Sequence, residues 1–171
     1  FGGANQKRGQ YANIVMRGGL VENGIYGGCN VTGNMEYDVA IQINGGQVGK
    51  DASHTANVHG GGLGNATRVL GNVSVAVGKQ NNGNTVEGDA VIYGDVYGGS
   101  AEGKTNGNNA QTPNAVTNVT LNAGTIYGSL YGGGLGNTTN NYAADVWGPV
   151  TVTVNGGKIC STSSDGSGAV F

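Results

Sequence analysis

The sequence predicts an all-β chain wound as a right-handed parallel β-solenoid, a β-helix of about five coils with three short strands per coil and uncapped ends. Three observations support this. The composition favours strands and turns, because 36 of the 171 residues are Gly, 22 are Asn and 20 are Val, against 6 Leu. A Gly-Gly phrase recurs along the chain, and an alternating apolar segment lies between its copies.

The recurring phrase is an aliphatic residue, then an aromatic residue or His, then Gly-Gly. Its copies are Ile25-Tyr26-Gly27-Gly28, Val58-His59-Gly60-Gly61, Val96-Tyr97-Gly98-Gly99 and Leu130-Tyr131-Gly132-Gly133, with partial copies at Phe1-Gly2-Gly3 and Val170-Phe171. The aromatic positions recur every 25 to 40 residues. A long repeat of this kind indicates units that bury their apolar faces only against one another.

The alternating segments are clearest at Val39–Ile43 and Val150–Val154, each followed by Asn-Gly-Gly. An alternation of period two buries one face of a strand. We expect Asn-Gly to supply the positive φ of the corners and to stack into amide ladders. Polar segments at 101–115, 136–144 and 161–168 read as variable loops that bulge from the stack.

The same sequence signals are compatible with two other architectures. Asn-Gly between alternating segments is also a hairpin signal, so an antiparallel sandwich or barrel is the rival fold. Low complexity with transient β-aggregation is a third interpretation. We expect a single repeat domain over residues 1–171, as a segment of a longer solenoid or fibre, because the sequence pattern shows no cap at either end.

The Gly-Gly-Gly and Asn-Gly-Gly corners resemble those of extracellular bacterial β-solenoid proteins, such as adhesins and surface-fibre repeat proteins. The resemblance covers the whole chain and implies an extracellular or cell-surface location. It implies a structural module, not an enzyme, that associates end to end with copies of itself or with further coils. The alternative is a carbohydrate-binding or carbohydrate-cleaving β-helix with glycans as partners. Antifreeze activity is a more distant one, since it needs regular Thr-x-Thr rows.

Composition argues against other partners. A net charge of −2 with 8 Lys and Arg predicts no nucleic-acid binding. No apolar stretch approaches the roughly 18 residues of a membrane helix, so we expect no membrane insertion. Residues Gly98 to Thr105 match the phosphate-binding pattern G-x-x-x-x-G-K-[ST], but the polar Asn/Gly-rich chain after Thr105 is a poor helix start, so no cofactor is expected.

Metal and catalytic sites are not expected either. The segments Gly60–Asn65 and Gly132–Asn137 resemble a calcium-binding repeat but lack its Asp. His54, His59 and Asp51 are close in sequence, yet His59 occupies the aromatic slot of the repeat. The carboxylate pairs Glu36/Asp38 and Glu87/Asp89 read as solvated charge. Cys29 and Cys160 should stay unbridged, because they belong to distant coils.

The aromatic slot is the candidate functional feature. The preceding aliphatic residue should face the core, so the aromatic side chain should face outward. An outward ladder is therefore expected from Phe1, Tyr26, His59, Tyr97, Tyr131 and Phe171, with a second short row from Tyr93 and Tyr127. Such a ladder either stabilises the solenoid itself or forms a stripe that stacks on sugar rings or a partner fibre.

Overall fold

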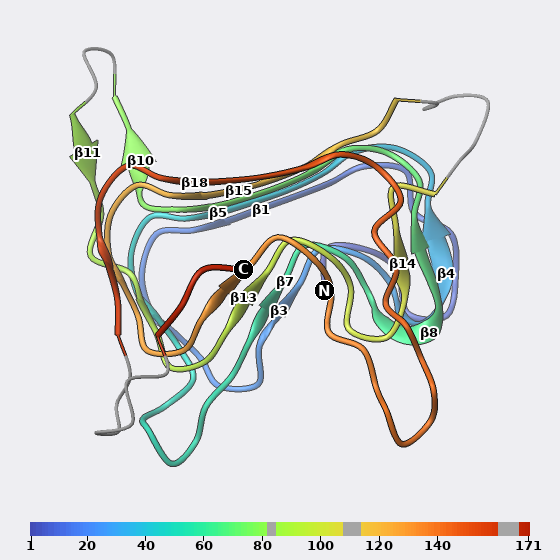
Figure 1. The fold of residues 1–171 in the computed structure, drawn as a ribbon, viewed down its shortest axis with the longest axis horizontal. Coiled ribbons are helices and arrows are strands. Elements are labelled where there is room, and N and C mark those ends of the chain that lie inside the picture. The colour runs from blue at the N-terminus through green and yellow to red at the C-terminus, as the bar shows by residue number, and fades with distance from the viewer. Residues whose placement is uncertain (82–84, 108–113, 161–167) are drawn as a thin grey trace.

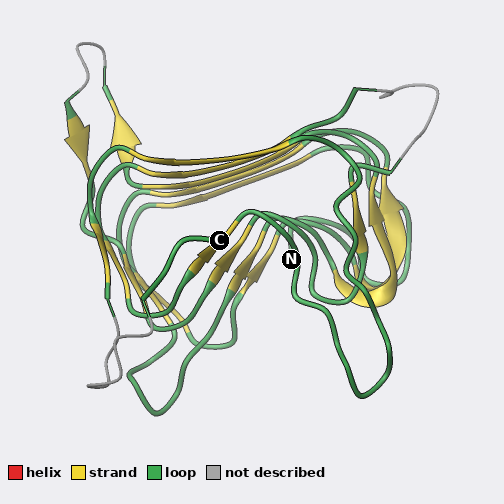
Figure 2. Cartoon of the chain, in the orientation of Figure 1, coloured by secondary structure: helices red, strands yellow, loops and turns green. Residues whose placement is uncertain are grey.

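The computed structural model describes residues 1–81, 85–107, 114–160 and 168–171. This part of the chain contains strands and turns and no helix. Consequently none of its segments is a helix long and apolar enough to cross a membrane. Successive passes of the chain stack on one another, and each pass runs through the same sheets in the same order (Figures 1 and 2).

Within the described residues, four parallel sheets form the body of the fold. The long sheet contains, in order, β1 (Ala12–Met16), β5 (Val39–Ile43), β9 (Val73–Val77), β15 (Thr117–Leu121) and β18 (Val150–Val154). The side sheet contains β2 (Leu20–Val21), β6 (Gln47–Val48), β12 (Val91–Ile92), β16 (Thr125–Ile126) and β19 (Lys158–Ile159). The ladder sheet contains β3 (Ile25–Tyr26), β7 (Val58–His59), β13 (Val96–Tyr97) and β17 (Leu130–Tyr131). The fourth sheet contains β4 (Asn30–Met35), β8 (Leu63–Val69) and β14 (Lys104–Thr105).

The all-β class and the parallel pairing are confirmed, and the rival antiparallel fold is wrong. Among the described strands, antiparallel pairing occurs only between β10 (Lys79–Gln80) and β11 (Val86–Glu87), which project as a hairpin. The expectation of three short strands per coil is also wrong, because the fourth sheet adds another. Its strands pair through the backbone and lack a regular apolar alternation, so a reading based on side chains assigns them to loops.

The variable loops correspond only in part to the segments named from the sequence. Within 101–115, Lys104–Thr105 is a strand of the fourth sheet, and residues 108–113 lie outside the described part. Residues 136–144 project from the stack and close on themselves through an antiparallel bridge between Asn137 and Tyr142. Residues 161–167 also lie outside the described part.

The core lies between the long sheet and the other three sheets. Long-sheet strands pair in register, so that Ile41 lies beside Val75 and Val75 beside Val119. All three side chains are buried. Ser74, which lies between Val73 and Val75 in the same strand, is exposed, as the alternation predicts. In β18 the pattern is weaker, because Val150 and Val154 on this outermost strand are 43% and 51% exposed.

The Asn-Gly-Gly corners need positive φ only at their last residue. Gly46, Gly124 and Gly157 have φ of 89°, 96° and 80°. The φ of the middle position is therefore compatible with a side chain, as Ala123 shows, although a Cβ at Gly45 or Gly156 would lie 2.9 or 2.6 Å from a backbone oxygen. The expected amide stacking is present at this corner, where Asn155 Nδ2 donates to Asn122 Oδ1 at 2.9 Å.

A row of glycines brings the ladder sheet against the long sheet. The residue after each aromatic slot is Gly, and a Cβ built there would overlap a long-sheet side chain. Gly27 faces Val39, Gly60 faces Val73, Gly98 faces Thr117 and Gly132 faces Val150. Because this row has no side chains, the two sheets approach each other closely. The ladder sheet bends inward toward the long sheet (Figure 1).

A second recurring backbone feature lies where the chain enters the fourth sheet. Gln6, Val31, Gly64 and Glu102 occupy equivalent positions in successive passes, and all have positive φ. Val31 has a φ of 66°, which is strained for a β-branched residue. Because the positive φ recurs in each of these passes, the path of the backbone requires it, whichever residue occupies the position.

We expect Gly60→Ala to lower the free energy of unfolding by more than about 2 kcal/mol, because the new methyl group overlaps Gly98 O and Val73 Cγ1. Gly133→Ala is the matched control, since a Cβ there meets nothing within 4 Å and its φ is not positive. It should leave stability unchanged or raise it by roughly 0.5 kcal/mol. Urea denaturation measures both, and equal midpoints would contradict the close approach of the two sheets.

We expect Val31→Gly to raise the free energy of unfolding by about 0.5–1 kcal/mol, because it removes the left-handed strain at a modest entropic cost. The reciprocal change, Gly64→Val, should lower it by about 1–3 kcal/mol, since it creates the same strain and places a Cβ 2.9 Å from Val31 O. Thermal melts of the two variants test the strain at these equivalent positions. A destabilised Val31→Gly protein would contradict it.

Candidate functional site: the aromatic ladder

The ladder is built on strands of only two residues each. The first residue of each strand is buried in the core: Ile25, Val58, Val96 and Leu130 are 6% exposed or less. The second residue lies on the opposite face of the sheet, as the alternation requires. Parallel pairing in register places Tyr26 beside His59, His59 beside Tyr97, and Tyr97 beside Tyr131.

The structure stacks all six rings named from the sequence into one row. The centroid distances are 4.9 Å from Phe1 to Tyr26, 5.1 Å to His59, 4.8 Å to Tyr97, 4.7 Å to Tyr131 and 4.9 Å to Phe171. The interplanar angles do not exceed 13°. This spacing matches the separation of neighbouring strands, so backbone pairing imposes the ring spacing.

The stacking limits what the ladder can bind. Each of the four inner rings has a neighbouring ring on both faces, and only its edge points away from the sheet. His59 and Tyr97 are 1% and 5% exposed. A sugar that stacks on an aromatic side chain needs the electron-rich face of the ring, which the edge does not offer. The arrangement therefore favours the self-stabilising interpretation of the ladder over the stripe of sugar platforms.

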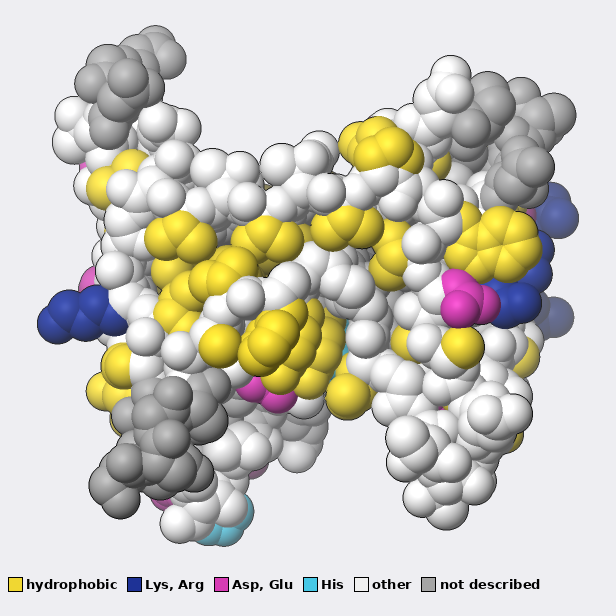
Figure 3. All heavy atoms as spheres, in the orientation of Figure 1, with side chains coloured by type: hydrophobic (Ala, Val, Ile, Leu, Met, Phe, Trp, Pro, Cys, Tyr) yellow, Lys and Arg dark blue, Asp and Glu magenta, His cyan; other side chains and the backbone are white. Residues whose placement is uncertain are grey.

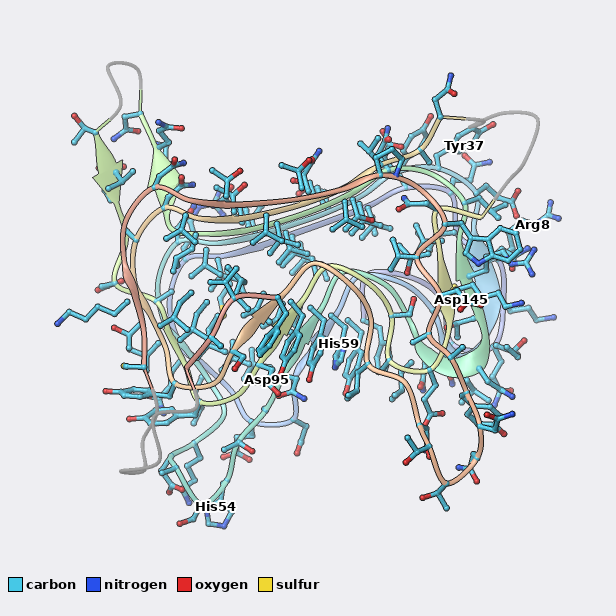
Figure 4. All side chains as sticks on the ribbon, viewed as in Figure 1. Arg8, Tyr37, His54, His59, Asp95 and Asp145 are labelled. Atoms are coloured by element: carbon cyan, nitrogen blue, oxygen red, sulfur yellow. The ribbon has the colours of Figure 1, made fainter. Side chains whose placement is uncertain are left out.

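The ladder lies in a hollow of the surface. Figure 3 shows the rings between two projecting parts of the molecule, and Figure 4 places His59 and Asp95 together at this position. One projection carries His54 near its tip (Figure 4), and the other is the loop around residues 136–144. The hollow follows from the glycine row, because the inward bend of the ladder sheet lowers the rings relative to both projections.

Burial determines the charge state of the rings. It lowers the pKa of His59 to about 4, so the imidazole is neutral at neutral pH and stacks as an aromatic ring. Its buried Nδ1 has no hydrogen-bond partner among the described residues. Burial also raises the pKa of Tyr26. Burial, followed by the neighbouring Asp95 carboxylate, raises the pKa of Tyr97 well above its usual value.

A polar column beside the ladder joins successive passes, and the sequence reasoning missed it. Asn57 Oδ1 accepts from the backbone N–H of Asp95 at 2.8 Å, and Asp95 Oδ1 accepts from that of Ser129 at 2.7 Å. Tyr97 donates its hydroxyl to Asp95 Oδ2 at 2.9 Å, which ties the column to the ladder. The sequence does contain a sign of this column, because Asn57, Asp95 and Ser129 each directly precede the aliphatic–aromatic pair of their repeat.

Two shorter aromatic pairs accompany the ladder. Tyr93 and Tyr127, the second row named from the sequence, stack at 4.9 Å. Tyr11 and Tyr37 stack at 4.7 Å, and this pair was missed because neither residue belongs to the Gly-Gly phrase. Tyr11 and Tyr37 each lie just before a strand of the long sheet. Tyr11 directly precedes β1, whereas one further residue separates Tyr37 from β5, so their distances from the strand differ.

The residues considered for metal or nucleotide binding do not converge on a site. Lys104 and Thr105 form a strand and not a helix N-terminus, and Thr105 is buried with its hydroxyl 3.0 Å from Ser100 Oγ. His54 pairs locally with Asp51 at 3.0 Å, whereas His59 lies in the ladder. In the described part of the chain, no three His, Cys, Asp or Glu side chains form a cluster that could hold a metal ion.

The remaining named residues have local structural roles. Glu87 pairs with Lys79 across the hairpin at 3.4 Å. Asp38 Oδ1 accepts from the backbone N–H of Asn72 at 2.8 Å. Cys29 and Cys160 are both free, as expected from their separation along the repeat.

No protein-family model matches this chain, and neither does any curated protein or solved structure. The resemblance to extracellular β-solenoid proteins therefore rests on the repeat pattern alone.

Acidification should destabilise the protein through His59. The unfolded imidazole takes up a proton near pH 6.5 and the folded one only near pH 4. Its contribution to stability is therefore complete above about pH 6.5 and falls as the pH drops to 4, by up to about 3 kcal/mol.

The control is His59→Tyr, which installs the residue found in neighbouring slots. Urea denaturation of both proteins from pH 7.5 to 4 should show the difference in unfolding free energy changing with pH. Parallel stability curves would rule out a buried neutral His59.

Asp95→Ala should lower the free energy of unfolding by about 1–3 kcal/mol, because it leaves the Ser129 N–H and the Tyr97 hydroxyl without their acceptor. Asp89→Ala, which removes an exposed carboxylate, serves as the matched control and should change stability by less than about 0.5 kcal/mol. Chemical denaturation gives both values, and similar losses in the two variants would argue against the column.

Proposed function

We propose that the chain is a structural module of a right-handed parallel β-solenoid, about five coils long, whose axial ends pack against further coils in an extracellular fibre or surface adhesin. The observation that carries the proposal is the distribution of exposed apolar side chains. Among the described residues, eleven large hydrophobic side chains are exposed, and all lie before residue 32 or after residue 134. They are Phe1, Tyr11, Val15, Leu20, Val31, Leu135, Trp147, Val150, Val154, Val170 and Phe171.

The backbone at the two axial ends supports the same proposal. β1 and β18 are the outermost strands of the long sheet, and each has one edge that no described strand pairs with. Such an edge is a template for another strand. The terminal rings of the ladder, Phe1 and Phe171, are 55% and 68% exposed, so each leaves a ring face for a further aromatic residue.

The occupant that fits these ends is another coil with the same repeat. It would continue the parallel pairing, cover Val150 and Val154 and add a ring to the ladder. The coil can come from the same chain or from another copy, because the contacts are identical. The extracellular location rests on the resemblance of the repeat pattern, and the occupied ring faces of the ladder speak against the carbohydrate-binding alternative at that surface.

The experiment measures association of the purified chain by analytical ultracentrifugation over a range of concentrations, with electron microscopy of the same samples. We expect elongated oligomers that grow with concentration. The variant Val154→Asp/Phe171→Asp, changed at one axial end, should remain monomeric. The variant Ser74→Asp/Asn118→Asp, changed on the exposed lateral face of the long sheet, should associate like the original chain. A monodisperse monomer at all concentrations would overturn the proposal.

A further inference from the structure

The fourth sheet carries a row of cations in a chain of net negative charge. Lys104 pairs in register with Arg68, and Arg68 with Asn34. The bridge between Gly9 and Met35 places Arg8 next in this row. Their neighbours Met35, Val69 and Thr105 are buried, so the row lies on the outer face of the sheet. Figure 3 shows Lys and Arg side chains gathered at this edge, and Figure 4 labels Arg8 there.

Two of these cations are neighbours that form no ion pair within the described residues, although the bridge between Thr105 and Val146 places Asp145 beside Lys104 at the end of the row. Arg68 and Lys104 lie on adjacent strands, and neither takes part in an ion pair within the described part of the chain. Arg8 differs, since its Nε lies 3.1 Å from Glu36 Oε1, although without hydrogen-bond geometry. Glu102 nearby accepts instead from Asn137 Nδ2 at 2.7 Å. Like charges on adjacent strands repel each other, and a bound anion would relieve this repulsion.

The cations line a polar cleft. Its volume is about 350 Å³, and its lining consists of Asn34, Asn65, Ala66, Thr67, Arg68 and Lys104. A second cleft of about 280 Å³ shares Asn65 and Lys104, extends to Tyr142, and is also lined by the carboxylates Glu102 and Asp145, so the first cleft is the one suited to an anion. These volumes are near the lower end of ordinary ligand sites. Lys104 stands between the two clefts and presents its charge to both.

An exposed indole completes the surface. Trp147 is 60% exposed, and Lys104 Nζ lies 5.6 Å from the centroid of its ring. Unlike the rings of the ladder, this ring has no stacked aromatic partner among the described residues. The cations and side-chain amides thus lie within adjoining clefts, and the indole lies outside both clefts beside Lys104.

We propose that this surface binds an anionic saccharide chain that runs along the solenoid axis, with a carboxylate or sulfate group held between Arg68 and Lys104. The amides of Asn34 and Asn65 each offer a donor and an acceptor, which suits sugar hydroxyls. The indole offers an apolar face for the C–H groups of a sugar ring. An acidic peptide would use the two cations but would have little use for this amide and indole surface. The cations and amides lie within one chain, so their contacts do not depend on the proposed end-to-end association; Trp147 alone is also among the exposed side chains on which that association rests.

The test is isothermal titration calorimetry with four probes: an oligogalacturonate, a sulfated dextran oligomer, a neutral dextran oligomer and poly-glutamate. The first two distinguish carboxylate from sulfate as the anion. We expect at least one of them to bind, the neutral dextran not to bind, and poly-glutamate to bind at least roughly tenfold more weakly. Binding should weaken as salt is added, because the contacts are charged and exposed.

The variant R68Q/K104Q should lose roughly tenfold or more in affinity for the bound saccharide. The matched control R17Q/K158Q removes the same charges from exposed positions outside this surface and should keep the original affinity. Circular dichroism checks that both fold; if the double variant does not, the single changes R68Q and K104Q replace it. Equal losses in the two double variants, poly-glutamate binding as tight as that of the saccharides, or no binding of either anionic saccharide would each overturn the proposal.

Discussion

The fold depends on the close contact between the ladder sheet and the long sheet. At Gly27, Gly60, Gly98 and Gly132 a single methyl group would overlap a long-sheet side chain. Such a contact does not supply much apolar area by itself, but it determines the shape of every pass of the chain. Because the glycines allow the two backbones to approach, the ladder sheet bends inward (Figure 1). Each pass adds mainly Val and Ile side chains to the core. The glycine content of the chain is therefore a packing requirement as well as a turn requirement.

The aromatic ladder follows from the same contact. The inward bend places the rings in a hollow, while parallel pairing in register holds their centroids 4.7–5.1 Å apart. Stacking then buries the inner rings and covers their faces. This explains why an imidazole can occupy one slot: in the stack His59 behaves as a neutral aromatic ring, because burial lowers its pKa to about 4. The cost is that its Nδ1 lacks a partner among the described residues.

The chemistry open to a ligand consequently lies elsewhere. The ladder uses its ring faces within the protein, and Asp95 uses its oxygens for Ser129 and Tyr97. The fourth sheet is different, since Arg68 and Lys104 stay unpaired with described acids beside two clefts and an exposed indole. Side chains that hold the passes together are therefore separate from those that could recognise a partner. Apart from Trp147, which belongs to both, the two proposals concern different surfaces for this reason: the axial ends are apolar, and the lateral surface of the fourth sheet is charged.

The sequence by itself determined the all-β class, the repeat and the identity of the ladder residues, because period-two alternation and the aliphatic–aromatic–Gly-Gly phrase are properties of neighbouring residues. The tertiary structure alone decided the fourth sheet, the Asn57–Asp95–Ser129 column, the Tyr11–Tyr37 pair and the meeting of Arg68 with Lys104. The physical reason is register. The repeat length varies between 25 and 40 residues, so counting along the chain does not tell which residue of one pass lies beside which residue of the next. Backbone pairing determines which residues become neighbours. In the fourth sheet the strands have no regular apolar alternation from which this pairing could be predicted.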